Sequence, residues 1–263
     1  MLSVQLALAL LASPGPSTGD SAPPGLSPTP PGRFVLDMPG YEGWTRWIAA
    51  DHTDRIGHVQ SVLAELGFYR GEIDGRPSRR LDSAIVAFHK ATDRPRDTSW
   101  TFEDEQNAAQ WHPDVPVSAR ERDRVEIDLD RQVLYLFRDG TVDAVLPVSS
   151  GNGRSYVHPY GYRVSSADTP EGNFRFYRRI DGLRRAPLGV LYRPWYFTGG
   201  FAVHGSPSVP PWPASHGCVR VTNWDADYLA DALELGMPVH VWSVDTRPPA
   251  PLTAGEDITS VYD

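Results

Sequence analysis

The chain has 263 residues, 40% of them hydrophobic and 22% charged, which suits one medium domain with a smaller companion. Its net charge of −8 argues against a function that depends on general attraction to nucleic-acid phosphates. A substrate must therefore be recognised by local contacts. The single cysteine excludes an intrachain disulfide, and one thiol alone cannot form a cysteine-rich zinc site.

The N-terminal residues predict export and a tether. Residues 2–12 form an apolar run as long as a signal-peptide core and are followed by small residues, although no Lys or Arg precedes them. We therefore expect residues 1–12 to be a signal segment of a secreted protein and the Pro-, Ser- and Gly-rich residues 13–33 to be a flexible linker. Because no stretch reaches the ~18 apolar residues of a membrane span, a transmembrane anchor is not expected.

Residues 34–112 show the hydrophobic spacing of helices. A first apolar stripe, which stops before Gly67, consists of Ile56, Val59, Val62, Leu63 and Leu66. After the turn-rich residues 69–75, a second stripe consists of Leu81, Ala84, Ile85 and Phe88. This pattern predicts a small helical domain, and residues 113–123 are expected to link it to the next part of the chain.

From residue 124 the hydrophobic period changes to two. Residues 124–129 alternate between apolar and polar side chains, and further apolar runs follow at 133–137 and 141–148. Asp139-Gly140 is a strong hairpin signal between the last two runs. The three segments together predict an antiparallel meander.

One helix is predicted after the meander. It covers residues 224–235, with Asn223 as N-cap and Gly236 just past its end. Residues 239–242 predict a last strand, and the Pro-rich, acidic residues 246–263 are expected to be disordered.

Cys218 has two histidines in positions to assist it. His216 lies two residues before it, which places both side chains on one face of an extended segment. His204 lies at the end of a strand-like run, and the proline-rich loop at 210–213 could return the chain towards it. Gly217 lets the backbone approach a ligand, so nearby amides could donate to a developing oxyanion.

Spacing alone leaves other interpretations of these residues open. A nucleophilic thiol needs a lowered pKa or an adjacent base, and its sulfur must be reachable. The two histidines could instead be ordinary hydrogen-bonded side chains, or they could hold a metal together with the cysteine. The cysteine could also be a buried and inert apolar residue.

Four motifs, in the same order, resemble the L,D-transpeptidase catalytic domain, often called the YkuD domain. They are Ile127-Asp128-Leu129 with Gln132-Val133-Leu134-Tyr135, Thr169-Pro170-Glu171-Gly172-Asn173-Phe174, Ser215-His216-Gly217-Cys218-Val219-Arg220 with the upstream His204-Gly205, and Leu235-Gly236-Met237-Pro238-Val239. The resemblance implies that residues 124–245 form a mainly β catalytic domain, a β-sandwich with one main helix.

The helical region resembles a second family, the peptidoglycan-binding domain built from three helices. The matching order is Val59-Gln60, Leu63, Leu66-Gly67-Phe68-Tyr69, Ile73-Asp74-Gly75, Ala84 and Phe88. Residues 78–81 and Phe88-His89 stand where that family usually has a Gly-x-x-Thr helix start and a Phe-Gln pair. The resemblance implies a three-helix N-terminal domain, and a degenerate helical spacer without binding activity is the alternative.

The catalytic resemblance also implies roles for individual residues. Cys218 would be the acylated nucleophile and His204 the base that activates it, with the carbonyl of Gly205 completing the triad. His216 would line the site and orient the substrate or the oxyanion, and the backbone amides around Gly217 and Cys218 would donate to that oxyanion.

Substrate contacts are expected from Ser215, Arg220, Tyr196 and Trp195. Arg220 could meet a substrate carboxylate or fix the loop, and a solvated surface arginine is the alternative. Trp195, Tyr196 and Phe201 could form a substrate lid, with simple core packing as the alternative. Residues 152–168 are expected to be an irregular insertion rich in Tyr, Ser and Gly.

The implied reaction is peptidoglycan L,D-transpeptidation, in which a cysteine thioester is converted into a 3→3 crosslink without metal or organic cofactor. The expected partners are peptidoglycan stem peptides, the expected location is the extracytoplasmic cell wall, and the expected state is a monomer. Hydrolysis of the stem by an L,D-carboxypeptidase and a catalytically silent wall-binding module are the alternative functions. A cysteine protease acting outside the wall is a more distant one.

Overall fold

The computed structural model describes residues 33–34, 52–115, 121–159, 161 and 164–247. The described residues all belong to the second of two units, Gly32–Asp263. The signal segment and nearly all of the first linker predicted from the sequence lie outside the described residues, as do residues 116–120 and 248–263. In the described ranges, no helix is long and apolar enough to cross a membrane.

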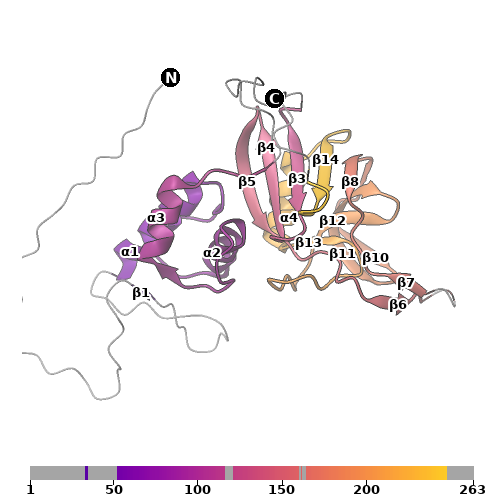
Figure 1. Cartoon of the computed structure of the whole chain (residues 1–263), viewed down its shortest axis with the longest axis horizontal. Coiled ribbons are helices and arrows are strands. Elements are labelled where there is room, and N and C mark those ends of the chain that lie inside the picture. Colours follow the sequence, from indigo (N-terminus) through magenta and orange to yellow (C-terminus); the bar gives the residue numbers. More distant parts are fainter. Residues whose placement is uncertain (1–32, 35–51, 116–120, 160, 162–163, 248–263) are drawn as a thin grey trace, which may run out of the picture. The chain divides into compact units, whose positions relative to one another are not determined.

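Three helices lie ahead of the two five-stranded sheets, as the resemblance to the three-helix domain implies (Figure 1). They are α1 (His52–Glu65), α2 (Arg79–Ala91) and α3 (Phe102–Gln110). The Ser78 side chain caps α2 by accepting the Leu81 amide, and Thr101 and Asp104 form a capping box at α3. A short antiparallel pair, β1 (Arg33–Phe34) and β2 (Trp100–Thr101), completes this helical part.

The predicted meander forms three adjacent strands of the first five-stranded sheet. Its strands are β3 (Arg124–Asp128), β4 (Val133–Arg138), β5 (Thr141–Pro147), β8 (Gly172–Arg175) and β14 (Pro238–Trp242), in the order β5-β4-β3-β14-β8. Asp139 and Gly140 both have positive φ, 50° and 80°, which the tight turn between β4 and β5 requires. The last strand, β14, is parallel to β3 and antiparallel to β8.

A second sheet packs against the first to make a sandwich (Figure 1). Its strands are β9 (Arg178–Arg179), β10 (Leu183–Ala186), β11 (Gly189–Thr198), β12 (Phe201–Gly205) and β13 (Val219–Val221). The order is β10-β11-β12-β13, with β9 also paired to β11, and β12 and β13 are parallel. Alternate side chains of both sheets fill the core between them, among them Ile127, Leu136, Val203 and Val219.

The helix after β13 differs from its prediction at both ends. α4 runs over Asn223–Ala232, and its N-cap is Thr222, not Asn223. Thr222 is extended and its hydroxyl accepts the Asp225 amide, whereas Asn223 already has helical geometry. The helix ends before Leu235 because Leu233 adopts an extended conformation, in which its side chain is buried in the sandwich core.

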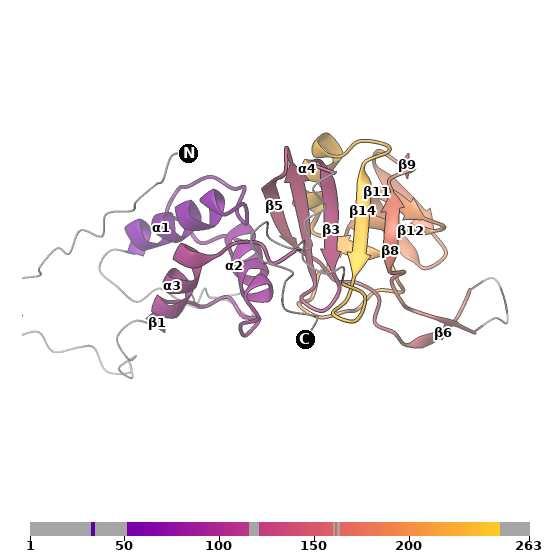
Figure 2. The ribbon, with the colours of Figure 1, turned by 45° about the horizontal axis from the view of Figure 1, so that its top comes forward.

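The prediction of an irregular insertion at 152–168 is wrong in one respect. β6 (Ser155–Val157) and β7 (Val164–Ser166) pair as an antiparallel hairpin within it. Figure 2 shows β6 extending away from the two sheets. Because both strands are short and exposed, they have no buried face and hence no alternating pattern by which the sequence could reveal them.

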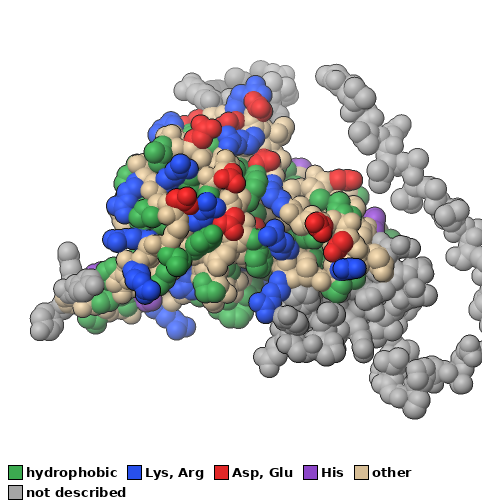
Figure 3. Space-filling model, turned by 180° about the vertical axis from the view of Figure 1, so that it is seen from behind, with side chains coloured by type: hydrophobic (Ala, Val, Ile, Leu, Met, Phe, Trp, Pro, Cys, Tyr) green, Lys and Arg blue, Asp and Glu red, His purple; other side chains and the backbone are tan. Residues whose placement is uncertain are grey.

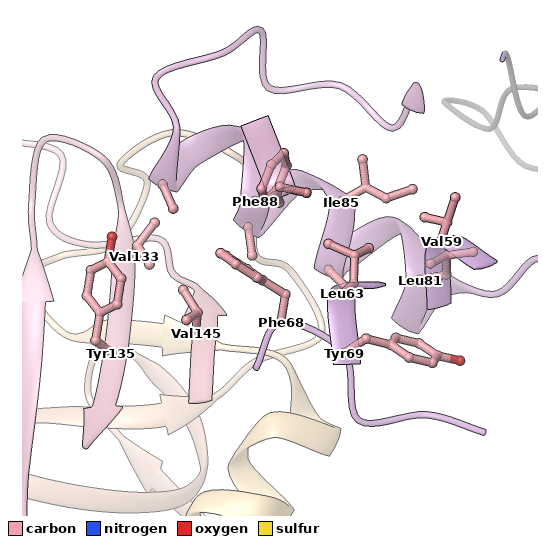
Figure 4. Packing of buried hydrophobic residues seen from close by; sticks show 14 of the residues in the cluster. Val59, Leu63, Phe68, Tyr69, Leu81, Ile85, Phe88, Val133, Tyr135 and Val145 are labelled. Carbon is pink, nitrogen blue, oxygen red and sulfur yellow. The ribbon is translucent and has the colours of Figure 1, made fainter. Parts of the chain in front are cut away.

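The helical part and the first sheet share one hydrophobic cluster. Figure 4 shows Phe68 and Phe88 on the helical side facing Val133 and Val145 on the sheet. At the same junction Lys90 of α2 is 1% exposed. Its Nζ donates to the carbonyl oxygens of Gln132, at 3.2 Å, and Val148, at 2.8 Å. The outer face of the sheet is therefore covered by the helices and not by water.

Candidate functional site

The parallel pair β12–β13 positions the histidine and the cysteine. Its register places His204 opposite Arg220, while Val203 lies opposite Val219 in the sandwich core. Because side chains alternate along a strand, His204 and Arg220 point to the face opposite the core. Cys218 lies two residues before Arg220, so it belongs to that same face.

This face forms one wall of a cleft of about 700 Å³. The structure brings most of the residues expected at the site to this cleft, namely Cys218, His204, His216, Ser215, Arg220, Tyr196 and Phe201. Trp195 does not line it: the side chain is 3% exposed and packs edge-on against Phe176 in the core. Its alternation with Tyr196 along β11 explains the difference, since neighbouring residues of a strand face opposite sides.

His204 is held in one tautomer by the next residue of its own chain. Its Nδ1 lies 2.9 Å from the carbonyl oxygen of Gly205. A carbonyl can only accept, so the proton must be on Nδ1, which leaves the Nε2 lone pair free to take a proton. Burial lowers the pKa of His204 to about 4, and the nearby Arg220 guanidinium acts in the same direction. The imidazole is therefore neutral at neutral pH.

Cys218 is partly buried under the turn between β11 and β12. Its Sγ lies 3.9 Å from the carbonyl oxygen of Gly200 and packs beside Tyr196 and Ala202. Burial raises the pKa of the thiol above its ordinary value, although the Ala202 amide and the Arg220 charge oppose this. The resting cysteine is consequently a thiol, and it becomes a nucleophile only if a base removes its proton.

Two hydroxyls fix the loop that carries the cysteine. Ser215 Oγ donates to the carbonyl of Cys218 at 2.6 Å and accepts the Gly217 amide at 2.9 Å. Thr169 Oγ1 donates to the Gly217 carbonyl at 2.8 Å and accepts the Gly151 amide at 2.9 Å. Since the Gly217 amide is engaged by Ser215 in this conformation, the Cys218 amide is the better candidate among the expected oxyanion donors.

Gly217 cannot be replaced without disturbing this loop. Its φ is +124°, which residues with a side chain rarely adopt. An added Cβ would lie 2.5 Å from the Phe201 ring and 2.7 Å from the carbonyl oxygen of Asp168. The glycine thus allows the close approach of the cysteine loop to the β11–β12 turn.

The segment that follows β5, residues 148–150, supports the cysteine loop through backbone hydrogen bonds. Ser149 and Arg220 exchange backbone hydrogen bonds of 3.0 and 3.1 Å, and the Ser215 amide donates to the Ser150 carbonyl. The Gln132 side chain holds Ser150 in turn, accepting its amide at 2.8 Å. Lys90 holds the carbonyl of Gln132 from the other side, so a chain of buried contacts joins α2 to the cysteine loop.

Sequence reasoning did not assign roles to Thr169, Gln132 or Lys90. The first two occur in quoted motifs, but each acts through a partner far along the chain, 48 residues away in the case of Thr169. Lys90 lies in a helix, where a lysine normally marks the solvent face. Its burial follows only from how the helix packs on the sheet.

His216 stands at the exposed rim of the cleft. Its ring makes an edge-on contact with Tyr156 of β6, with 4.9 Å between ring centroids. The alternative that His204, His216 and Cys218 hold a metal is not supported, because no three His, Cys, Asp or Glu side chains in the described ranges cluster closely enough. The cleft therefore offers a neutral imidazole, a thiol and a guanidinium on one face.

Comparisons with known proteins identify relatives of this chain. A family model described as the L,D-transpeptidase catalytic domain, YkuD, matches residues 122–241. The crystal structure of an L,D-transpeptidase from Xylanimonas cellulosilytica is similar, with 34% identity and a TM-score of 0.68 over 83% of this chain and 100% of that one. A comparison with curated proteins finds no match.

Two further solved structures are more distant. An L,D-transpeptidase (Yku) from Stackebrandtia nassauensis is 23% identical, with a TM-score of 0.43 over 74% of this chain and 93% of that one. An L,D-transpeptidase from Mycobacterium smegmatis is 22% identical, with a TM-score of 0.38 over 46% of this chain and 58% of that one.

The Xylanimonas match extends beyond the region of the family model. Residues 122–263 make up 142 of the 263 residues, so a match covering 83% of the chain must include part of the helical region. The family model itself does not reach that region.

Proposed function

Because the chain belongs to the L,D-transpeptidase family, which acts on the peptidoglycan of the cell wall, we propose that it forms 3→3 crosslinks through a thioester on Cys218. The observation that carries this proposal is the placement of Cys218 and His204 on one face of β12–β13, lining one cleft. The Gly205 carbonyl holds the imidazole in the tautomer that a general base needs.

In the first half-reaction the neutral His204 takes the proton of the Cys218 thiol as the sulfur attacks the donor carbonyl, which precedes the terminal D-alanine of a stem. The carbonyl oxygen becomes an oxyanion, to which the Cys218 amide donates. As the intermediate collapses, the carbon–nitrogen bond breaks and the imidazolium gives its proton to the departing amine. D-alanine leaves and the donor remains as a thioester.

In the second half-reaction an amine of a neighbouring stem attacks the thioester carbonyl. His204 takes a proton from the attacking amine, and the carbon–sulfur bond breaks as the new amide forms. That proton returns to the sulfur and regenerates the thiol. Splitting the exchange into two steps lets the same base and the same oxyanion donor serve twice.

We further propose that the protein acts outside the cytoplasm, with residues 1–12 as signal segment and 13–33 and 113–123 as linkers. Residues 34–112 would be a peptidoglycan-binding-like domain ahead of the catalytic domain at 124–245. Their own affinity is tested by pull-down of the Cys218→Ala variant on insoluble peptidoglycan. Loss of capture when the same amount of soluble stem peptide is added would place binding in the cleft instead.

The activity is tested with a purified stem tetrapeptide and intact-mass spectrometry. We expect an acyl adduct equal to the donor minus D-alanine, followed by dimers whose fragmentation shows 3→3 linkage. Cys218→Ala should abolish the adduct and His204→Gln should slow its formation by a factor of about 10² to 10⁴. A matched control is His58→Gln, an exposed histidine of α1, which should react as the parent does.

Two results would contradict the proposal. Tripeptide without dimers, at high acceptor concentration, would identify a carboxypeptidase. An adduct that persists in Cys218→Ala would mean that another residue is acylated.

A further inference from the structure

Strand register places three arginines on the face that carries Cys218. Antiparallel pairing sets Arg178 of β9 opposite Tyr196, and Arg184 of β10 opposite Leu191. Tyr196 and Leu191 belong to the small cluster against which Cys218 packs. Residues directly opposite each other share a face of the sheet, so Arg178 and Arg184 lie on the cleft side, as Arg220 does.

The cleft that these arginines line is cationic although the whole chain carries a net charge of −8. Its lining includes Arg178, Arg184 and Arg220 and, among the described residues, no Asp or Glu. Among the residues that the structure describes, none of these three arginines forms an ion pair. By contrast, Arg193 of β11 pairs with both Asp181 and Asp227. In Figure 3, several Lys and Arg side chains lie along the left edge of the molecule, the side on which Figure 1 shows β10 and β11.

Arg178 is held in place for contact with a ligand. Its guanidinium lies over the Tyr196 ring, 4.5 Å from the centroid, at the cleft wall. The next arginine, Arg179, lies over the ring of Trp195 and so faces the other side of the strand. A stacked guanidinium keeps its donors directed outward and loses less side-chain entropy when it binds a carboxylate.

The sheet order separates these two arginines from the nucleophile. β9 and β10 both pair with β11, and β12 lies between β11 and β13. Three strand spacings of ~4.8 Å separate the backbones by about 14 Å, a distance that the long arginine side chains shorten. Arg220 is close enough for a charge beside the scissile bond, while Arg178 and Arg184 suit a charge farther along the donor peptide.

We propose that Arg178 and Arg184 form a carboxylate-binding subsite, which selects acyl-donor peptides with a free carboxyl group on the residue that precedes the one carrying the scissile carbonyl. This proposal rests on the proposed function, because it assigns the cleft to a peptide donor. Two guanidinium groups without acidic neighbours attract an anion, and amidation of that carboxyl removes both the charge and one acceptor oxygen.

The test compares two synthetic stem tetrapeptides that differ only at the second residue, whose carboxyl is free in one and a carboxamide in the other. The free peptide should acylate the full chain with a kcat/KM at least about tenfold higher than that of the amidated peptide. Arg178→Gln and Arg184→Gln should each remove most of that preference by lowering kcat/KM for the free form. Raising the salt concentration should narrow the preference, since exposed charges are screened.

The matched control is Arg185→Gln. Arg185 lies next to Arg184 on β10 but faces the other side and does not line the cleft, so its replacement should leave the preference intact. The subsite is ruled out if the parent does not discriminate, or if Arg185→Gln has the same effect as Arg184→Gln. Either result leaves the proposed function standing, provided that both peptides acylate Cys218.

If neither peptide acylates the parent, the proposed function fails and the subsite is still tested by binding. Calorimetric titration of Cys218→Ala with the two peptides should show at least about tenfold tighter binding of the free form. Equal affinities would overturn the subsite proposal independently of turnover.

Discussion

Burial sets the protonation of both Cys218 and His204, and it acts against an ion pair. The pKa of the thiol is raised and that of the imidazole is lowered to about 4, so both groups are neutral at neutral pH. Proton transfer must then accompany the attack, once a substrate has displaced water from the cleft. The stable resting form also protects the enzyme from unproductive thiol chemistry.

This protonation pattern predicts how acylation depends on pH. Below its pKa His204 carries a proton and cannot accept another, so kcat/KM should fall only as the pH approaches about 4. From about pH 6 to about pH 8 the acid limb of an ordinary histidine should be absent. The measurement is the rate of adduct formation without acceptor, with circular dichroism to confirm folding at each pH.

Alkylation gives an independent readout of the thiol. The rate of iodoacetamide modification of Cys218 should still rise with pH above about 8, because the thiol pKa lies above its ordinary value. A plateau below neutral pH would instead reveal a thiolate–imidazolium pair and contradict the neutral resting state.

Thr169 provides a second test at the residue scale. Its hydroxyl bridges the Gly217 carbonyl and the Gly151 amide, and both groups would lose a partner in Thr169→Val. We expect a loss of about 1–3 kcal/mol in the free energy of unfolding, together with slower acylation, since the cysteine loop is loosened. Thr169→Ser keeps the hydroxyl and should retain most of the free energy of unfolding and of the acylation rate. If Thr169→Ser loses as much of either as Thr169→Val, packing of the methyl group matters instead.

Among the elements, α2 contributes more than a covering helix. Its Lys90 donates hydrogen bonds to the carbonyls of Gln132 and Val148, next to the segment 148–150 that supports the cysteine loop. Burial lowers the pKa of Lys90 to about 7, with Arg96 adding to the effect. A packed helix is thereby tied to the backbone from which the site is built.

The lowered pKa makes the stability of this junction depend on pH. Between pH 10.5 and about 7 the unfolded lysine is protonated while the folded one is not, so the unfolded state binds more protons and acidification favours unfolding. Below about pH 7 Lys90 is protonated in both the folded and the unfolded state, so its contribution to the free energy of unfolding no longer changes with pH. Relative to Lys90→Met, the parent should therefore lose on the order of 2 kcal/mol between about pH 9 and about pH 7.

Urea unfolding of both proteins at the two pH values measures this difference. The variant also loses two hydrogen bonds, but that cost is independent of pH and cancels in the comparison. A constant difference between parent and Lys90→Met would mean that Lys90 is as solvated in the folded protein as in the unfolded chain.

For the whole molecule, the helical part and the sandwich depend on each other. The outer face of β4 presents Val133 and Tyr135 to the helices, and β5 adds Val145. If residues 122–247 were produced alone, that apolar surface would be exposed to water. We expect such a fragment to aggregate or to unfold at a markedly lower temperature, as judged by soluble yield and thermal circular dichroism.

A chain that begins at Gly32, the boundary of the second unit, is the matched control and should behave as the full chain does. A stable, monomeric fragment 122–247 would show that the sheet does not need its helical cover.

Much of the fold could be predicted because local patterns match local structure. The alternation from residue 124, the positive-φ turn at Asp139-Gly140 and the helical stripes each depend on neighbours in sequence. The hairpin β6–β7 could not, since its exposed strands lack an apolar face. The cap at Thr222 was missed because Thr and Asn are both good caps, and only the backbone angles choose between them.

By itself the sequence determined the family, the order of the elements and the set of residues around Cys218, since motifs and hydrophobic periods are properties of the chain. Only the tertiary structure decided that Trp195 lies in the core and Tyr196 in the cleft, that the Gly217 amide is engaged, and that Lys90 is buried. These features depend on strand register and on packing between distant segments, and long-range contacts of that kind leave no periodic trace in the sequence.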